Sequence, residues 1–128
     1  MLNHAAILIA EDETYIALAL QWVVEDAGGS VIGPAATVGD ALALLNNNFV
    51  EAAILDVNLS DGDITPIVQR LTAMGAVIIF QTGTGLPPEL AARFPDLTVQ
   101  MKPYNPEKLV EQLGEKLRTR QTSAALSK

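Results

Sequence analysis

Apolar residues along the chain follow two alternating patterns. Short apolar runs, typical of buried strands, occupy residues 5–10, 31–33, 53–56 and 76–80, and a more weakly apolar run occupies residues 97–101. Between them, apolar residues recur every three or four positions, which predicts helices over residues 14–27, 38–45, 64–74, 87–93 and 106–120. Strands that alternate with helices form parallel β-α-β units, so we predict an α/β fold in which helices doubly wind a parallel sheet.

Signals at the helix ends support this division. Thr37 is suited to cap the second helix and Asn105 the fifth, because their side-chain oxygens can accept backbone N–H groups of the first turn. Gly75 is typical of a helix C-terminus. Trp22 lies on the first helix away from its main apolar stripe, and we expect half-buried packing there rather than a docking face.

Length and composition fit one cytoplasmic domain. We assign the core to residues 1–120 and a flexible tail to 121–128. No apolar stretch approaches the ~20 residues of a membrane span, and no basic, signal-like segment is visible, so we expect no membrane partner. The absence of cysteine excludes disulfides and thiolate chemistry. A net charge of -7, with twelve acids against two bases in residues 1–101, disfavours nucleic acid as a partner.

Polar and charged side chains lie where the predicted strands end. Glu11 and Asp12 follow the first strand, Asp56 ends the third, Thr82 follows the fourth and Lys102 the fifth. Open α/β sheets form their sites at this edge. Carboxylates placed together repel one another unless a cation lies between them, and Mg²⁺ binds through one or two carboxylates and keeps positions for other oxygens. We therefore predict a Mg²⁺ site here.

The position of Asp56 suits nucleophilic chemistry. A carboxylate beside Mg²⁺ can attack phosphorus and form an aspartyl phosphate. Lys102 would offset charge on the phosphoryl oxygens, and the Thr82 hydroxyl would donate a hydrogen bond to one of them. Taken singly, Asp12 also fits a helix N-terminal acid, Lys102 a surface lysine and Thr82 a turn residue. Their joint placement at neighbouring strand ends favours the site.

The order and spacing of these side chains carry a family resemblance. The chain is similar, over about residues 5–118, to the receiver domain of two-component response regulators. That resemblance implies a flavodoxin-like fold with strand order 2-1-3-4-5. The residues that carry it are Glu11, Asp12, Asp56, Thr82, Lys102 and Pro103.

The resemblance also implies a role for each position. Asp56 would be the phospho-acceptor, and Thr82 the switch hydroxyl. Lys102 would contact the phosphoryl group and precede Pro103 in a cis peptide bond. The metal ligands would be Glu11, Asp12, Asp56 and the backbone carbonyl of Asn58.

Two features set this chain apart within the family. Receivers commonly carry Tyr or Phe three residues before the lysine, where the ring reports phosphorylation, but this chain has Val99. Tyr104, after the proline, is not expected to replace that ring, so activation should change the fourth-helix face less than usual. Residues 80–85 resemble, with departures at Gln81 and Gly85, the Phe-Ala-Thr-Gly-x-Tyr motif of a subgroup similar to small alphaproteobacterial regulators.

These observations predict a stand-alone receiver in a phosphorelay, with no enzymatic activity beyond its own phosphorylation and dephosphorylation. Its partners would be a sensor histidine kinase or a histidine phosphotransfer protein and an unknown output protein, and it would be a monomer or a weak phosphorylation-dependent dimer. It would signal by binding a protein or act as a phosphate sink.

Two alternatives remain. A haloacid-dehalogenase-like phosphatase would need a second Asp where this chain has Asn58, and a cap domain for which there is no length. A phosphorylation-independent pseudo-receiver scaffold usually lacks the acids or the lysine, which are all present.

Overall fold

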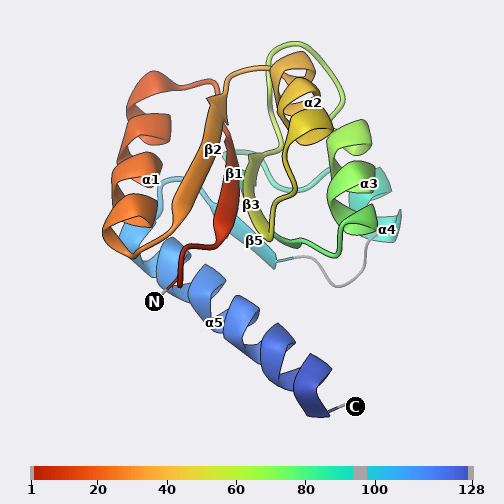
Figure 1. Ribbon diagram of the computed structural model, residues 1–128. Coiled ribbons are helices and arrows are strands. Elements are labelled where there is room, and N and C mark those ends of the chain that lie inside the picture. Colours follow the sequence, from red (N-terminus) through yellow and green to blue (C-terminus); the bar gives the residue numbers. More distant parts are fainter. Residues whose placement is uncertain (1, 94–97, 127–128) are drawn as a thin grey trace.

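The strands form one parallel sheet in the order β2-β1-β3-β4-β5, and helices cover both of its faces (Figure 1). The computed structural model describes residues 2–93 and 98–126, with side chains as far as residue 120. Both the α/β class and the strand order agree with the prediction. The strands are β1 (Ala6–Ala10), β2 (Ser30–Ala35), β3 (Ala52–Asp56), β4 (Val77–Thr82) and β5 (Thr98–Met101).

The helices divide between the two faces of the sheet. In Figure 1, α1 and α5 lie on one side, and α2, α3 and α4 on the other. Each face is covered because both sides of a parallel sheet are apolar. The bounds are α1 (Thr14–Asp26), α2 (Val38–Asn47), α3 (Thr65–Ala73), α4 (Pro88–Arg93) and α5 (Pro106–Leu126).

Alternation along the strands divides the core into two clusters. Ile9, Ile54 and Ile79 point to the face under α1 and α5. Leu55 and Phe80 point to the opposite face, under the other three helices. All five side chains are fully buried. Successive residues of a strand point to opposite faces, so the face of any residue at a strand end follows from these clusters.

Two strands are longer than the apolar runs predicted. β2 continues through Pro34 to Ala35, with an irregular register against β1. A proline is tolerated there because β2 is an edge strand. β4 continues past Phe80, so that Gln81 and Thr82 are its last two residues and are fully buried rather than part of a loop.

The predicted helix caps are present. Thr37 Oγ1 accepts the Asp40 backbone N–H at 3.0 Å, and Asn105 Oδ1 accepts the Glu107 N–H at 2.9 Å. Asp61, which the sequence analysis did not single out, adds a second cap to α2 by accepting the Val38 N–H at 2.7 Å. This hydrogen bond holds the pKa of Asp61 below its usual range.

The C-terminal helix is longer than expected. α5 continues to Leu126, past residue 120, where we placed the end of the domain. Residues 121–126 contain neither proline nor glycine, so nothing in this segment interrupts a helix. The rest of the predicted tail, residues 127–128, lies outside the described residues. Among the helices of the described part, none is both long and apolar enough to cross a membrane.

The expectation of half-buried packing for Trp22 is wrong. Its side chain is 63% exposed, and Tyr15 on the same helix is 89% exposed. The buried face of α1 is formed by Ala17, Leu20 and Val24, and helical spacing places Tyr15 and Trp22 on the side opposite to it. The outer face of α1 is therefore aromatic and open to solvent.

Candidate functional site

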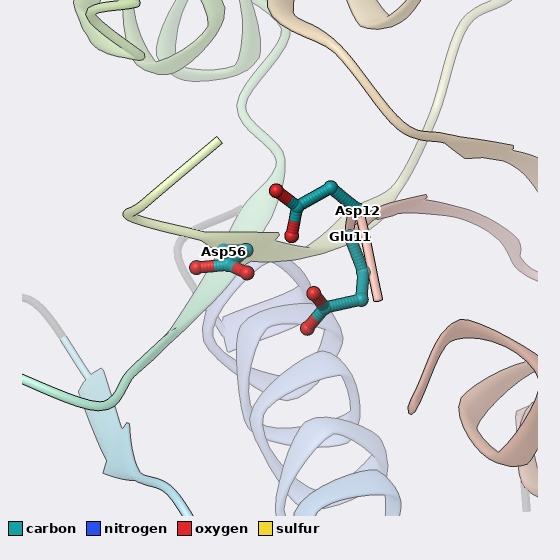
Figure 2. A group of neighbouring side chains, drawn as sticks. All are labelled: Glu11, Asp12 and Asp56. Atoms are coloured by element: carbon teal, nitrogen blue, oxygen red, sulfur yellow. The ribbon is translucent and has the colours of Figure 1, made fainter. Parts of the chain in front are cut away.

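Three carboxylates meet at the ends of β1 and β3. Glu11, Asp12 and Asp56 each offer an oxygen atom, and these atoms lie within 4.8 Å of one another (Figure 2). Ala10 of β1 pairs with Leu55 of β3, so the next residue on each strand, Glu11 and Asp56, is also adjacent. Glu11 and Asp56 are buried, whereas Asp12 is less so.

Lys102 places an ammonium group against this cluster. Its Nζ lies 3.0 Å from Asp56 Oδ2, 3.1 Å from Glu11 Oε1 and 3.7 Å from Glu13 Oε1. The Lys102 N–H donates to the carbonyl of Thr82 at 2.8 Å, which extends the β4–β5 ladder to the lysine. The Lys102-Pro103 peptide bond is cis, as predicted.

The carboxylates decide the charge state of Lys102. Burial by itself would lower the pKa of the ammonium group, but its hydrogen bond to Asp56 and the negative charges of Asp56 and Glu11 outweigh burial and raise that pKa. Lys102 therefore stays protonated over the physiological range and supplies a fixed positive charge at the end of the sheet.

Glu11 shows that one ammonium group does not satisfy this cluster. Burial, reinforced by the neighbouring Asp56 carboxylate, raises the pKa of Glu11 to about 7. Its Oε2 accepts the Glu13 N–H at 3.0 Å, but within the described part of the chain Oε1 accepts no hydrogen bond, even though Lys102 Nζ lies 3.1 Å away. A buried carboxylate oxygen without a proper donor, beside two further carboxylates, fits a hard divalent cation such as Mg²⁺.

Thr82 lies at the predicted strand end but turns toward the loop that follows. Its Oγ1 donates to the Gly85 carbonyl at 3.1 Å and accepts the N–H groups of Thr84 and Gly85, both at 3.1 Å. The hydroxyl also accepts from Asn58 Nδ2 at 3.3 Å. Donation from Thr82 to a phosphoryl oxygen stays a prediction, and it requires the hydroxyl to leave Gly85.

Asn58 contacts the site through a group that was not predicted. Its backbone N–H donates to Asp56 Oδ1 at 2.8 Å and thereby orients that carboxylate. The role assigned to its backbone carbonyl, as a metal ligand, stays a prediction. Asp56 thus has one oxygen held by Asn58 and the other by Lys102.

Sequence reasoning missed two side chains beside the site. Gln81 is fully buried next to Asp56, and Tyr104 donates a hydrogen bond to Gln81 Oε1. The signal for Gln81 was available, because a polar residue that follows four apolar residues of a buried strand must itself be buried if the strand continues. The position of Tyr104 depends on the path of the chain after Pro103, which no periodicity encodes.

Similar proteins were found by comparison with solved structures. No family model and no curated protein matches the sequence. A response regulator receiver domain protein (CheY-like) from Methanospirillum hungatei JF-1 is 30% identical with a TM-score of 0.81, and the alignment covers 93% of this chain and 98% of that one. The response regulator PhyR from Brucella abortus is 27% identical with a TM-score of 0.79 over 96% of this chain, which spans only 51% of PhyR.

A third solved structure contains a modified residue. It is a response regulator protein from Burkholderia pseudomallei with a phosphorylated aspartic acid, a calcium ion and citrate. It is 22% identical to this chain with a TM-score of 0.73, and the alignment covers 96% of this chain and 74% of that one. At this identity the likeness concerns the fold.

Proposed function

Because the chain belongs to the response regulator receiver domains, we propose that it is a signalling domain whose Asp56 accepts a phosphoryl group from a histidine kinase or a histidine phosphotransfer protein. The observation that carries the proposal is the setting of Asp56 at the end of β3, where the Lys102 ammonium group contacts both Asp56 and the neighbouring Glu11 carboxylate. We infer no activity beyond its own phosphorylation and dephosphorylation.

The transfer is a displacement at phosphorus. A carboxylate oxygen of Asp56 forms a bond to the phosphorus of a phosphohistidine, and the P–N bond breaks with its electron pair passing to the imidazole nitrogen. The donor histidine is left as a neutral imidazole, or as an imidazolium if that nitrogen takes up a proton from solvent. Dephosphorylation is a hydrolysis. Water attacks phosphorus, the bond between phosphorus and the Asp56 oxygen breaks, and inorganic phosphate leaves while the Asp56 carboxylate is restored.

The side chains around Asp56 have separate parts in this reaction. The Asn58 N–H orients one oxygen of the nucleophile. Lys102 contacts the other oxygen at 3.0 Å and is placed to offset charge that develops on the phosphoryl oxygens. Thr82 then donates to one of those oxygens once its hydroxyl turns away from Gly85. Lys102 thus supplies positive charge, the Asn58 N–H orients the Asp56 carboxylate, and the Thr82 hydroxyl orients the phosphoryl group.

A divalent cation fits the acids of this site. Glu11, Asp12 and Asp56 would hold it, with the backbone carbonyl of Asn58 as the further ligand we propose. When bound, Mg²⁺ supplies positive charge that stabilises the phosphoryl oxygens during transfer. The calcium ion and phosphorylated aspartic acid of the Burkholderia pseudomallei protein support the pairing of a divalent cation with this chemistry.

The decisive test is intact mass after incubation with acetyl phosphate and Mg²⁺. We expect the wild-type chain to gain one phosphoryl group, and Asp56→Asn to gain none, because an amide is a far weaker nucleophile than a carboxylate. Asp26→Asn is the matched control, since Asp26 lies exposed at the far end of α1. If the wild-type chain neither gains mass nor binds beryllofluoride, a stable phosphoryl mimic, the proposal is wrong.

We further propose that the phosphodonor protein covers the outer face of α1. Tyr15, Leu18 and Trp22 are exposed there at helical spacing, and α1 begins at Thr14, directly beyond the acids of the site. A protein that brings a phosphohistidine to Asp56 must approach over this end of the sheet. Exposed aromatic residues beside a reactive group are typical of protein contacts.

A double variant, Tyr15→Ser with Trp22→Ser, tests this docking face. We expect phosphoryl transfer from a histidine-phosphorylated phosphotransfer protein to slow by about 10-fold or more, because each lost aromatic contact costs about 1 kcal/mol or more. Phosphorylation by acetyl phosphate, which needs no docking surface, should be unchanged. Phe49→Ser, at another exposed aromatic residue outside α1, is the control. Equal slowing with both donors would contradict a docking role.

A further inference from the structure

Gln81 is a fully buried polar side chain to which the proposed chemistry assigns no part. On β4 it pairs with Asp56 of β3, and its carbonyl accepts the Val57 N–H at 3.0 Å. Two residues after Ile79, it points to the face of the sheet under α1 and α5, as Asp56 does two residues after Ile54. Gln81 and Asp56 are therefore neighbours in one row across this face.

Tyr104 connects this row to the segment that carries Lys102. Its hydroxyl donates to Gln81 Oε1, and its ring packs against the cluster formed with α1 and α5. Burial raises the pKa of the phenol, and the carboxylates of Glu11 and Asp56 raise it further. The hydroxyl therefore keeps its proton and remains a donor within the electric field of the acidic site.

Only one of the two polar atoms of the Gln81 side-chain amide is hydrogen-bonded to another described residue. Its oxygen is hydrogen-bonded to Tyr104, but its Nε2, also buried, has no hydrogen-bond partner among the residues that the structure describes. Buried side-chain donors in native proteins are nearly always paired, so the free donor of Gln81 calls for an explanation. A donor without a protein partner can form a further hydrogen bond if its surroundings change.

Val99 of β5 occupies the position, three residues before the lysine, where receiver domains commonly carry Tyr or Phe. Val99 pairs with Phe80 of β4 and packs against the opposite cluster, under α2, α3 and α4. The aromatic ring that lies nearest in sequence to Lys102 is Tyr104, on the α5 side of the sheet. A response carried by Tyr104 would reach α5, which begins at Pro106 only two residues later.

We propose that Tyr104 and Gln81 are positioning residues that report the state of Asp56 to the first turn of α5. This inference rests on the proposed phosphorylation of Asp56. A phosphoryl group adds negative charge at Asp56 and draws Lys102 toward its oxygens, away from Glu11. Tyr104, joined to Lys102 through Pro103, follows this shift, and its hydrogen bond to Gln81 determines the position that the start of α5 takes.

The test follows the ring signals of carbon-13-labelled tyrosine and the backbone amide signals by NMR, with beryllofluoride and Mg²⁺ as the phosphoryl mimic. Tyr15 and Tyr104 are the only tyrosines in the chain, so Tyr15→Phe leaves a single labelled ring and assigns it. We expect the Tyr104 ring and the backbone amides of residues 107–110 to shift on addition of the mimic, and the amides of α4 to shift less.

Tyr104→Phe removes only the hydroxyl and is the central variant. We expect it to bind beryllofluoride and to be phosphorylated as the wild type is, but to lose the amide shifts of residues 107–110. Gln81→Met, which fills the same space without the amide, should give the same loss and provides a second test if the first variant folds poorly. A purely structural role would leave these shifts intact.

Two other outcomes are distinguishable. If the wild type binds beryllofluoride but its Tyr104 ring does not move, or if both variants keep the α5 shifts, the reporter role is overturned while the proposed phosphorylation stands. If the wild type binds no beryllofluoride and gains no phosphoryl group, both proposals fail together.

Discussion

Lys102→Met is expected to slow phosphorylation of Asp56 by acetyl phosphate by about 100-fold and to destabilise the metal-free fold by about 3 kcal/mol. The rate falls because the phosphoryl oxygens lose the ammonium group that lies 3.0 Å from Asp56 Oδ2. Stability falls because two buried carboxylates, Glu11 and Asp56, lose their shared cation. Mass spectrometry measures the rate, and urea unfolding in the presence of a chelator measures the stability.

The matched control for Lys102→Met is Lys108→Met. Lys108 is an exposed residue of α5, six positions along the chain, so its replacement should change neither quantity appreciably. Adding Mg²⁺ should recover part of the stability of the Lys102 variant, because a divalent cation also neutralises the carboxylates. If Lys102→Met unfolds at the same urea concentration as Lys108→Met, the ammonium group does not support these acids as we describe.

Mg²⁺ is expected to raise the melting temperature of the metal-free protein by about 10 °C. When the free ion exceeds its dissociation constant by a factor of about 100, binding to the folded state alone adds about 2.7 kcal/mol, and each kcal/mol is worth roughly 3–5 °C in a domain of this size. Removing the ion with a chelator should reverse the shift. Differential scanning calorimetry at matched ionic strength measures it.

Asp12→Asn shows whether the ion binds where we propose. Asp12 is the least buried of the three acids, so its replacement removes a ligand with little disturbance to the core. We expect the shift in melting temperature to be lost in Asp12→Asn and kept in Asp26→Asn, which removes an acid far from the site. A full shift in both variants would place the Mg²⁺ elsewhere.

The pattern of apolar residues was enough to predict the elements and the α/β class, whereas the strand order came from the resemblance to receiver domains. Continuous apolar runs and helical spacing are direct consequences of burial on both faces of a parallel sheet, which is why the element types and their order agree with the structure. The grouping of Glu11, Asp12, Asp56 and Lys102 followed for the same reason, since the ends of adjacent parallel strands meet at one edge. The roles of these residues in phosphoryl transfer stay proposals.

Features that depend on how distant segments of the chain pack together were harder to predict. The helical spacing of α1 places Trp22 opposite the buried face of Ala17, Leu20 and Val24, but it does not say whether another segment covers that outer side. The Tyr104–Gln81 hydrogen bond joins two segments far apart in the chain, and it arises only when the turn after Pro103 brings the ring over β4. Likewise, Asp61 caps α2 from a distant loop.

The two edge strands also determine how copies of this protein can meet. In residues 2–93 and 98–126, β2 pairs only with β1 and β5 only with β4, so each leaves one row of backbone groups without a neighbouring strand. Pro34 interrupts the row of N–H donors in β2, and β5 is only four residues long. Short or proline-interrupted edges are poor templates for adding a strand from another molecule. Growth of intermolecular sheets, the usual route to fibrillar aggregation, is therefore disfavoured at both edges, and reversible encounters are left to the helical faces.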